Sequence, residues 1–180
     1  MLLTEDLDKL RYPIGKFSLA LPLTDEQVEQ HILSIAGLPA RLQEAVEKMT
    51  PEQLDTPYRD GGWTVRQVIH HLPDSHMNGY IRQKLALTED LPKIRVYHED
   101  IWATLPDSLL GAPEISIALL AALHQRWVLL LKSLPPEQLE RKLIHPESGE
   151  QRIREHIGLY AWHGEHHLAH ITALKKREGW

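Results

Sequence analysis

The sequence contains no cysteine among its 180 residues. Disulfide bonds, thiolate metal sites, iron–sulfur clusters and a cysteine nucleophile are therefore excluded, and a bound metal ion must use nitrogen and oxygen ligands. Thiol chemistry would need a thiol from outside the chain. Basic charge is also scarce: 20 lysines and arginines stand against 25 aspartates and glutamates, a net charge of −5. Because binding to a phosphate backbone requires a basic surface, we expect no nucleic-acid partner.

Long uninterrupted hydrophobic runs are also missing. The most apolar stretch, residues 115–131, is broken by His124, Gln125 and Arg126, which indicates a core helix and not a membrane span. The start, MLLTEDLDKL, has acidic residues and no apolar stretch of signal-peptide length. We therefore expect a cytoplasmic protein without a membrane partner. A length of 180 residues suits one domain that spans residues 1–180.

Hydrophobic residues recur at helical spacing in four stretches of the chain. The sequence predicts helices over residues 25–49, from residue 64 onward, from residue 113 to the proline pair at 135 and 136, and over residues 152–176. Runs that alternate apolar and polar residues do not reach sheet length, although residues 93–97 could form a short extended piece.

The connections between these stretches set the expected topology. Thr24 with Gln27, and Thr64 with Gln67, match the capping box that starts a helix. About two dozen residues, several of them proline, separate the second stretch from the third and are too many for a tight hairpin. The fold class is therefore predicted to be all-α, a four-helix bundle with a long crossover between helices 2 and 3 that lets these two helices lie parallel.

Histidine is abundant, at 12 of 180 residues, and it is concentrated near the C-terminus. His156, His163, His167 and His170 fall within about 60° of arc on one face of the last predicted helix, the face expected to line the bundle interior. His163 and His167 are one helical turn apart. That spacing lets two imidazoles on a rigid helix bind one metal ion.

A third ligand should come from another helix, and the second predicted helix offers His70, His71 and His76. Ideal helical angles centre His76 on the apolar stripe and place His71 on its flank, so periodicity alone would choose His76. Pro73 disturbs the turn before it, which makes angles extrapolated across it unreliable. Spacing therefore leaves the choice open. His124, which lies mid-stripe in the third helix, is interpreted as a hydrogen-bonded core residue.

Signatures of several other catalytic classes are missing. Gly164 stands where the H-E-x-x-H motif of zinc proteases needs its glutamate, and Glu165 projects away from the histidine face. The sequence also contains no G-x-S-x-G elbow, no phosphate-binding glycine loop and no G-x-G-x-x-G motif. These absences argue against a zincin protease and against a serine nucleophile.

Two motifs together carry a resemblance to a known family. WTVRQVIHHLPD at 63–74, and WHGEHHLAHI at 162–171, resemble motifs of the DinB-like superfamily. Nearly the whole chain, including YPIG at 12–15 and TPYRDGGWTV at 56–65, is similar to the YfiT branch of that superfamily. The resemblance implies that His71, His163 and His167 bind a divalent metal ion. Pro73 departs from the alanine-like residue usual at its position.

Three neutral imidazoles leave a divalent ion its full charge and at least one open coordination position, which suits catalysis more than a structural role. The resemblance to the YfiT branch implies that the reaction is hydrolysis, so we expect a metal-dependent hydrolase that activates water against a small-molecule substrate. The resemblance also implies an alternative, a thiol S-transferase that uses bacillithiol or a related low-molecular-weight thiol as co-substrate. A non-catalytic metal-binding stress protein is a third hypothesis.

The expected ion is zinc, because three imidazoles with an open position suit it, and nickel is the alternative because it binds the same ligands. Asp74 is the candidate general base or hydrogen-bond acceptor. A metal-bound imidazole normally donates its other N–H to a neighbour, so four further residues are expected to line or support the site: Tyr160, His170, His124 and Trp127. The resemblance also implies a homodimer.

Overall fold

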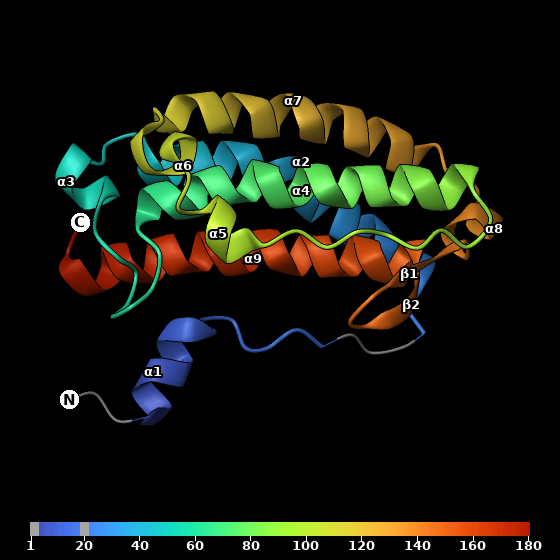
Figure 1. Cartoon of the computed structure of the whole chain (residues 1–180), viewed down its shortest axis with the longest axis horizontal. Coiled ribbons are helices and arrows are strands. Elements are labelled where there is room, and N and C mark those ends of the chain that lie inside the picture. The colour runs from blue at the N-terminus through green and yellow to red at the C-terminus, as the bar shows by residue number, and fades with distance from the viewer. Residues whose placement is uncertain (1–3, 19–21) are drawn as a thin grey trace.

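The computed structural model describes residues 4–18 and 22–180. Four long helices lie side by side in it, as Figure 1 shows. They are α2 (Asp25–Val46), α4 (Val65–Thr88), α7 (Pro113–Lys132) and α9 (Ile153–Glu178). α2 packs against α9 and α7, and α4 packs against the same two helices, which closes the bundle. The predicted all-α four-helix bundle is confirmed.

The helix starts follow the capping signals in the sequence. Thr24 and Thr64 each accept a hydrogen bond from the backbone N–H three residues later, and the glutamine at that position bonds back to the threonine N–H. α2 ends at Val46, before the predicted residue 49, because a further capping box at Thr50 starts the short helix α3 (Pro51–Leu54). α4 continues through Pro73 to Thr88.

The long crossover between α4 and α7 makes these two helices parallel, as predicted. Figure 1 shows the chain returning along the bundle after α4, through the short helices α5 (Glu99–Trp102) and α6 (Pro106–Leu110), before α7 starts at the same end as α4. The side chain of His70 in α4 bonds both to the end of this crossover and to α7. Its Nδ1 lies 2.7 Å from Ser116 Oγ, and its Nε2 lies 3.1 Å from the Gly111 carbonyl oxygen.

The remaining elements are short. α1 (Thr4–Arg11) lies beside the bundle, and α8 (Pro136–Leu139) leads into an antiparallel hairpin of β1 (Lys142–His145) and β2 (Gly149–Arg152). The sequence did not predict this hairpin, because strands of four residues are too short to show an alternating pattern. The expected extended piece at 93–97 contributes one bridge, in which Lys93 pairs with Ile144.

Two hydrophobic clusters fill the two halves of the bundle. One surrounds Trp127 and Ile157, and the other surrounds Leu42 and Leu72. Buried histidines lie among these side chains: His76 and His124 are 0% and 1% exposed. Among the described residues, α7 is the one helix long and apolar enough to span a membrane by length and composition, but here it packs against α2 and α4. Histidines are the most numerous of the buried polar residues, which also include Gln83 and Ser75.

Candidate metal centre

Three histidines from two helices meet between α4 and α9. One potential ligand nitrogen from each of His71, His163 and His167 lies within 4.8 Å of the others. The Nε2 atoms of His71 and His163 are 3.2 Å apart. The His167 ring centroid lies 4.7 Å from that of His71 and 4.5 Å from that of His163. The structure thus brings together the three residues that the family resemblance implied.

This arrangement fits a single divalent ion. Zinc binds imidazole nitrogen at about 2.0–2.1 Å with tetrahedral geometry, which places two ligand nitrogens about 3.3 Å apart. The 3.2 Å between the Nε2 atoms of His71 and His163 matches this value. Nitrogen ligands without carboxylates suit zinc or nickel better than calcium or magnesium.

The protein also holds these imidazoles in the protonation state that binds metal. Burial lowers the pKa of His71 to about 3, and burial together with the neighbouring histidines lowers the pKa of His163 and His167 well below 6.5. All three rings are therefore neutral near pH 7. A neutral imidazole has a lone pair for a metal ion, whereas a protonated one has none.

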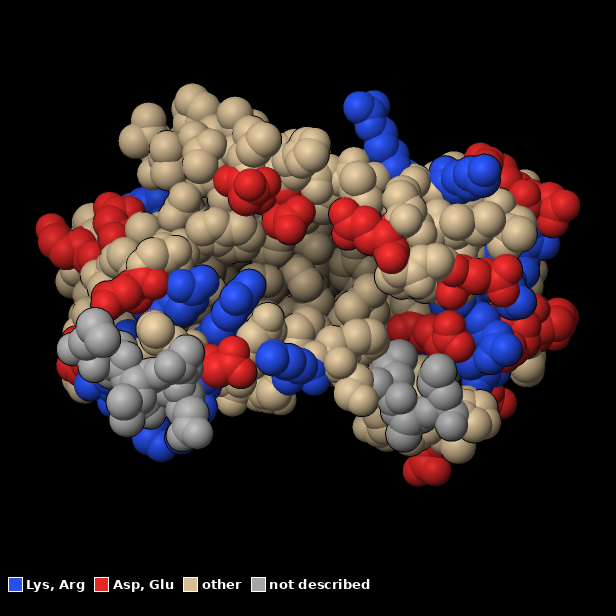
Figure 2. All heavy atoms as spheres, turned by 60° about the horizontal axis from the view of Figure 1, so that its bottom comes forward, with Lys and Arg blue, Asp and Glu red and all other residues tan. Residues whose placement is uncertain are grey.

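A pocket of about 470 Å³ opens beside the cluster, and His71 and His167 form part of its wall. Trp63 covers one side, with its ring centroid 4.7 Å from that of His71 and 6.2 Å from that of His167. Residues with charges of both signs also line the pocket, together with Tyr12 and Tyr58; the charged ones are Arg11, Arg59, Glu99 and Asp100. Figure 2 shows a hollow on this side of the molecule with acidic side chains along one edge and basic ones along another.

Two further histidines line the same pocket. His170 stacks on Tyr58 at a centroid distance of 3.9 Å, and its Nε2–H donates to the Arg11 carbonyl oxygen at 3.0 Å. His166 stacks on Trp162 at 4.5 Å. Burial lowers the pKa of both histidines to about 4, so they too are neutral near pH 7. The wall of the pocket is therefore polar but uncharged close to the cluster.

The structure places the predicted supporting residues in two groups. Tyr160 and Trp127 pack around His76, with ring centroids 5.2 and 5.8 Å from its own. His124 bonds the Ile35 carbonyl through Nδ1 at 2.6 Å, as expected for a core histidine, and also contacts His76. His170 belongs to the pocket wall.

Asp74 lies one turn after His71 in α4 and is half-buried. Burial, with the negative charge of Asp107, raises the pKa of its carboxyl to about 6. Its role as general base stays a prediction. The pocket residues Trp63, Arg59 and Glu99 were not singled out as site residues from the sequence, since they lie in loops and a short helix whose positions have no periodic signal.

Gly164 explains how α9 approaches α2 next to the cluster. A Cβ atom at this position would lie 2.5 Å from Leu38 Cδ2 and 3.5 Å from His76 Cε1. Glu165 projects away from the histidine cluster, as expected, and pairs with Arg41 and Ser34 of the same helix α2 at 2.5 to 2.7 Å. A side chain in place of Gly164 would meet Leu38, which would have to move, so the zinc-protease arrangement does not fit this packing without rearrangement.

Comparison with known protein families shows the family to which the chain belongs. The model of the DinB superfamily matches residues 35–171, which include both histidine-bearing helices. This chain belongs to the DinB superfamily. Its fold is also similar to that of YfiT from Bacillus subtilis, with a TM-score of 0.93 and 51% identity over 96% of this chain and 99% of the other. YfiT is described as "a probable metal-dependent hydrolase with an unusual four-helix bundle topology".

Other relatives of this DinB superfamily protein have similar names. Proteins of Bacillus cereus (strain 03BB102) and Bacillus thuringiensis subsp. konkukian are each 55% identical over 97% of this chain and 100% of their own length. Both are named "Putative metal-dependent hydrolase". The three-histidine cluster of this DinB superfamily chain is thus the kind of site that a metal-dependent relative would need.

Proposed function

We propose that this protein is a metal-dependent hydrolase that binds one divalent ion through His71, His163 and His167. The observation that carries the proposal is the pocket: two of the three histidines form part of its wall, so an ion bound by the cluster would be reachable from solvent. A structural zinc site is usually closed by four protein ligands. The open pocket favours an enzyme over a non-catalytic metal-binding stress protein.

Each part of the site has a task in this proposal. When bound, the ion would supply Lewis acidity that lowers the pKa of water or of a thiol. The Trp63 ring, which lies against His71 and His167, would shield one side of these histidines from water. Asp74 does not line the pocket but lies one turn after His71 in α4. Its carboxyl pKa of about 6 makes it largely ionised near pH 7.5, and we assign it the role of general base. The charged residues of both signs that line the pocket would orient a polar small-molecule substrate.

Transfer of an external thiol is the second candidate. The chain lacks cysteine, so the thiol must enter the pocket from solution. Arg11 and Arg59 are among the residues that line the pocket, and their positive charges suit a thiol that carries carboxylate groups, such as bacillithiol. Zinc remains our first choice of ion and nickel the alternative. We also keep the proposal that the protein acts in the cytoplasm.

Turnover assays separate the two reactions. Protein purified without a nickel column is stripped with a chelator, reloaded with zinc, and tested on ester and amide substrates with and without bacillithiol. We expect product to form without thiol, and we expect this activity to disappear when the metal is stripped and to return when zinc is added. Product formed only with bacillithiol, on chlorinated aromatic or epoxide substrates, would favour the transferase instead. His98→Ala, an exposed histidine on the crossover, is the control variant.

A further inference from the structure

His76 and His124 lie outside the proposed ligand set, yet they connect end to end with one ligand. His163 Nδ1 lies 3.2 Å from His76 Nε2, and His76 Nδ1 lies 2.9 Å from His124 Nε2. His124 Nδ1 lies 2.6 Å from the backbone carbonyl oxygen of Ile35. His76 and His124 are 0% and 1% exposed, so solvent cannot replace these partners. The contacts form a continuous series from α2 to the cluster.

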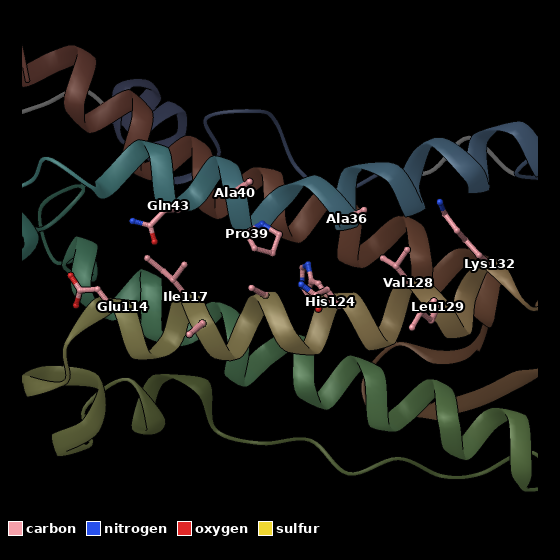
Figure 3. A pocket seen from close by; sticks show the side chains of 13 residues that line it. Ala36, Pro39, Ala40, Gln43, Glu114, Ile117, His124, Val128, Leu129 and Lys132 are labelled. Atoms are coloured by element: carbon pink, nitrogen blue, oxygen red, sulfur yellow. The ribbon is translucent and has the colours of Figure 1, made fainter.

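The series starts at a carbonyl that a proline leaves free. In a regular helix the Ile35 carbonyl would accept a hydrogen bond from the N–H of residue 39. That residue is Pro39, which lies inside α2 and has no N–H. His124 supplies the missing donor from α7. Figure 3 shows His124 and Pro39 on facing helices, at a groove of about 870 Å³ between α2 and α7.

The carbonyl sets the direction of every hydrogen bond in the series. A carbonyl only accepts, so His124 carries its proton on Nδ1 and has a lone pair on Nε2. His76 must then donate from Nδ1 and accept at Nε2, and His163 must donate from Nδ1. In a neutral ring this leaves the lone pair of His163 on Nε2, the atom that lies 3.2 Å from His71 Nε2.

We propose that the Ile35 carbonyl, His124 and His76 form a hydrogen-bonded column that fixes His163 in its Nδ1–H tautomer and presents its Nε2 lone pair for metal binding. His76 and His124 are positioning residues in this account. They also hold the plane of the His163 ring, because its Nδ1–H has a buried acceptor in a fixed place. The proposal rests on the proposed three-histidine site.

The tautomers can be measured without any metal. Long-range ¹H–¹⁵N spectra of metal-free protein labelled with ¹⁵N-histidine distinguish a protonated Nδ1 from a protonated Nε2, and single substitutions assign the signals. We expect the Nδ1–H form at His163, His76 and His124 near pH 7.5. The Nε2–H form at His163 would overturn the proposal. Because this result does not depend on catalysis or on a bound ion, it remains valid if the proposed function fails.

Zinc affinity gives the second test. His76→Leu removes the acceptor for His163 and should weaken zinc binding about 10- to 100-fold, the usual effect of losing such a partner. His76→Gln, whose amide can accept from His163 and donate to His124, should restore most of the affinity. His156→Gln is the matched control, because His156 is equally buried in α9 but bonds Gln83 and lies outside the column.

Unchanged zinc affinity in a folded His76→Leu variant would overturn the proposal. If that variant does not fold, His124→Leu replaces it, since it breaks the column one step further from the ligand. The expected result is then an increased Nε2–H population at His163 in the spectra and a smaller loss of affinity. A His163 ring that keeps its Nδ1–H form and full affinity in His124→Leu would equally contradict the column. Wild-type protein that binds no zinc would instead contradict the proposed metal site.

Discussion

Replacing His156 by glutamine should make the metal-free protein less sensitive to acid. His156 is 1% exposed in α9, and Gln83 Nε2–H donates a hydrogen bond to its Nδ1 at 3.3 Å. Burial lowers the pKa of this histidine from 6.5 to about 3. The folded protein therefore holds His156 neutral over a pH range in which the unfolded chain protonates it.

The sign and size of the effect follow from this difference. Since the folded pKa is depressed, the stability contributed by neutral His156 is complete above pH 6.5 and is lost as the pH falls through the range from 6.5 to 3. At a pH one unit below the unfolded pKa, this histidine has lowered the unfolding free energy by about 1.4 kcal/mol. Between pH 7.5 and pH 6 the loss from this one residue is about 0.8 kcal/mol, and by pH 5 it reaches about 2 kcal/mol.

Urea unfolding of chelator-treated protein at pH 7.5 and pH 6, followed by circular dichroism, measures the effect. The drop in unfolding free energy between these two pH values should be about 0.8 kcal/mol smaller in His156→Gln than in wild type. His98→Gln, in which an exposed histidine is replaced, is the control and should keep the wild-type drop. An equal drop in His156→Gln and wild type would refute the reasoning that burial keeps this imidazole neutral.

Three further predictions concern packing, catalysis and assembly. Gly164→Ala should destabilise the protein by about 1–3 kcal/mol, because the new Cβ meets Leu38. Gly37→Ala is the control and should not destabilise it, because the one atom within 4 Å of its new Cβ is Arg41 Nε, at 3.7 Å. Asp74→Asn should bind metal normally but lose most of its turnover, and a normal turnover number would remove Asp74 from catalysis. Light scattering at micromolar concentration should give a dimer mass. The reason is exposed apolar surface that a second copy would cover, such as the Leu110 side chain, which is 82% exposed. A monomer mass would contradict this prediction.

The long helices could be predicted because their signals are local. Capping threonines, apolar residues at spacings of three and four, and a proline at the start of α7 all act within one helix. The hairpin and the short helices of the crossover could not, because their positions depend on the surfaces against which they pack. Residues 1–3 and 19–21 lie outside the described part of the chain, and residues 1–3 include the start of the stretch MLLTEDLDKL.

The site shows how far helical periodicity can predict contacts. Angles along α4 favoured His76 over His71, and His76 is indeed the more central residue, at 0% exposure. But periodicity only indicates which residues face the interior and not which neighbouring helix each side chain meets. His76 meets both α7 and α9, through His124 and His163, and the structure gathers His71 with His163 and His167 instead. The column from Ile35 could not be predicted either, because with its end at His163 it joins all four long helices.

Metal content of single-residue variants tests the central claim most directly. Elemental analysis is applied to wild type, His71→Ala and His167→Ala, each purified without a nickel column and checked for folding. The neighbouring histidines of the same helices provide matched controls, His70→Ala and His166→Ala. Our account predicts about one equivalent of zinc in wild type and in both controls, and its loss in His71→Ala and His167→Ala. Stoichiometric zinc retained in His71→Ala would contradict the three-histidine site.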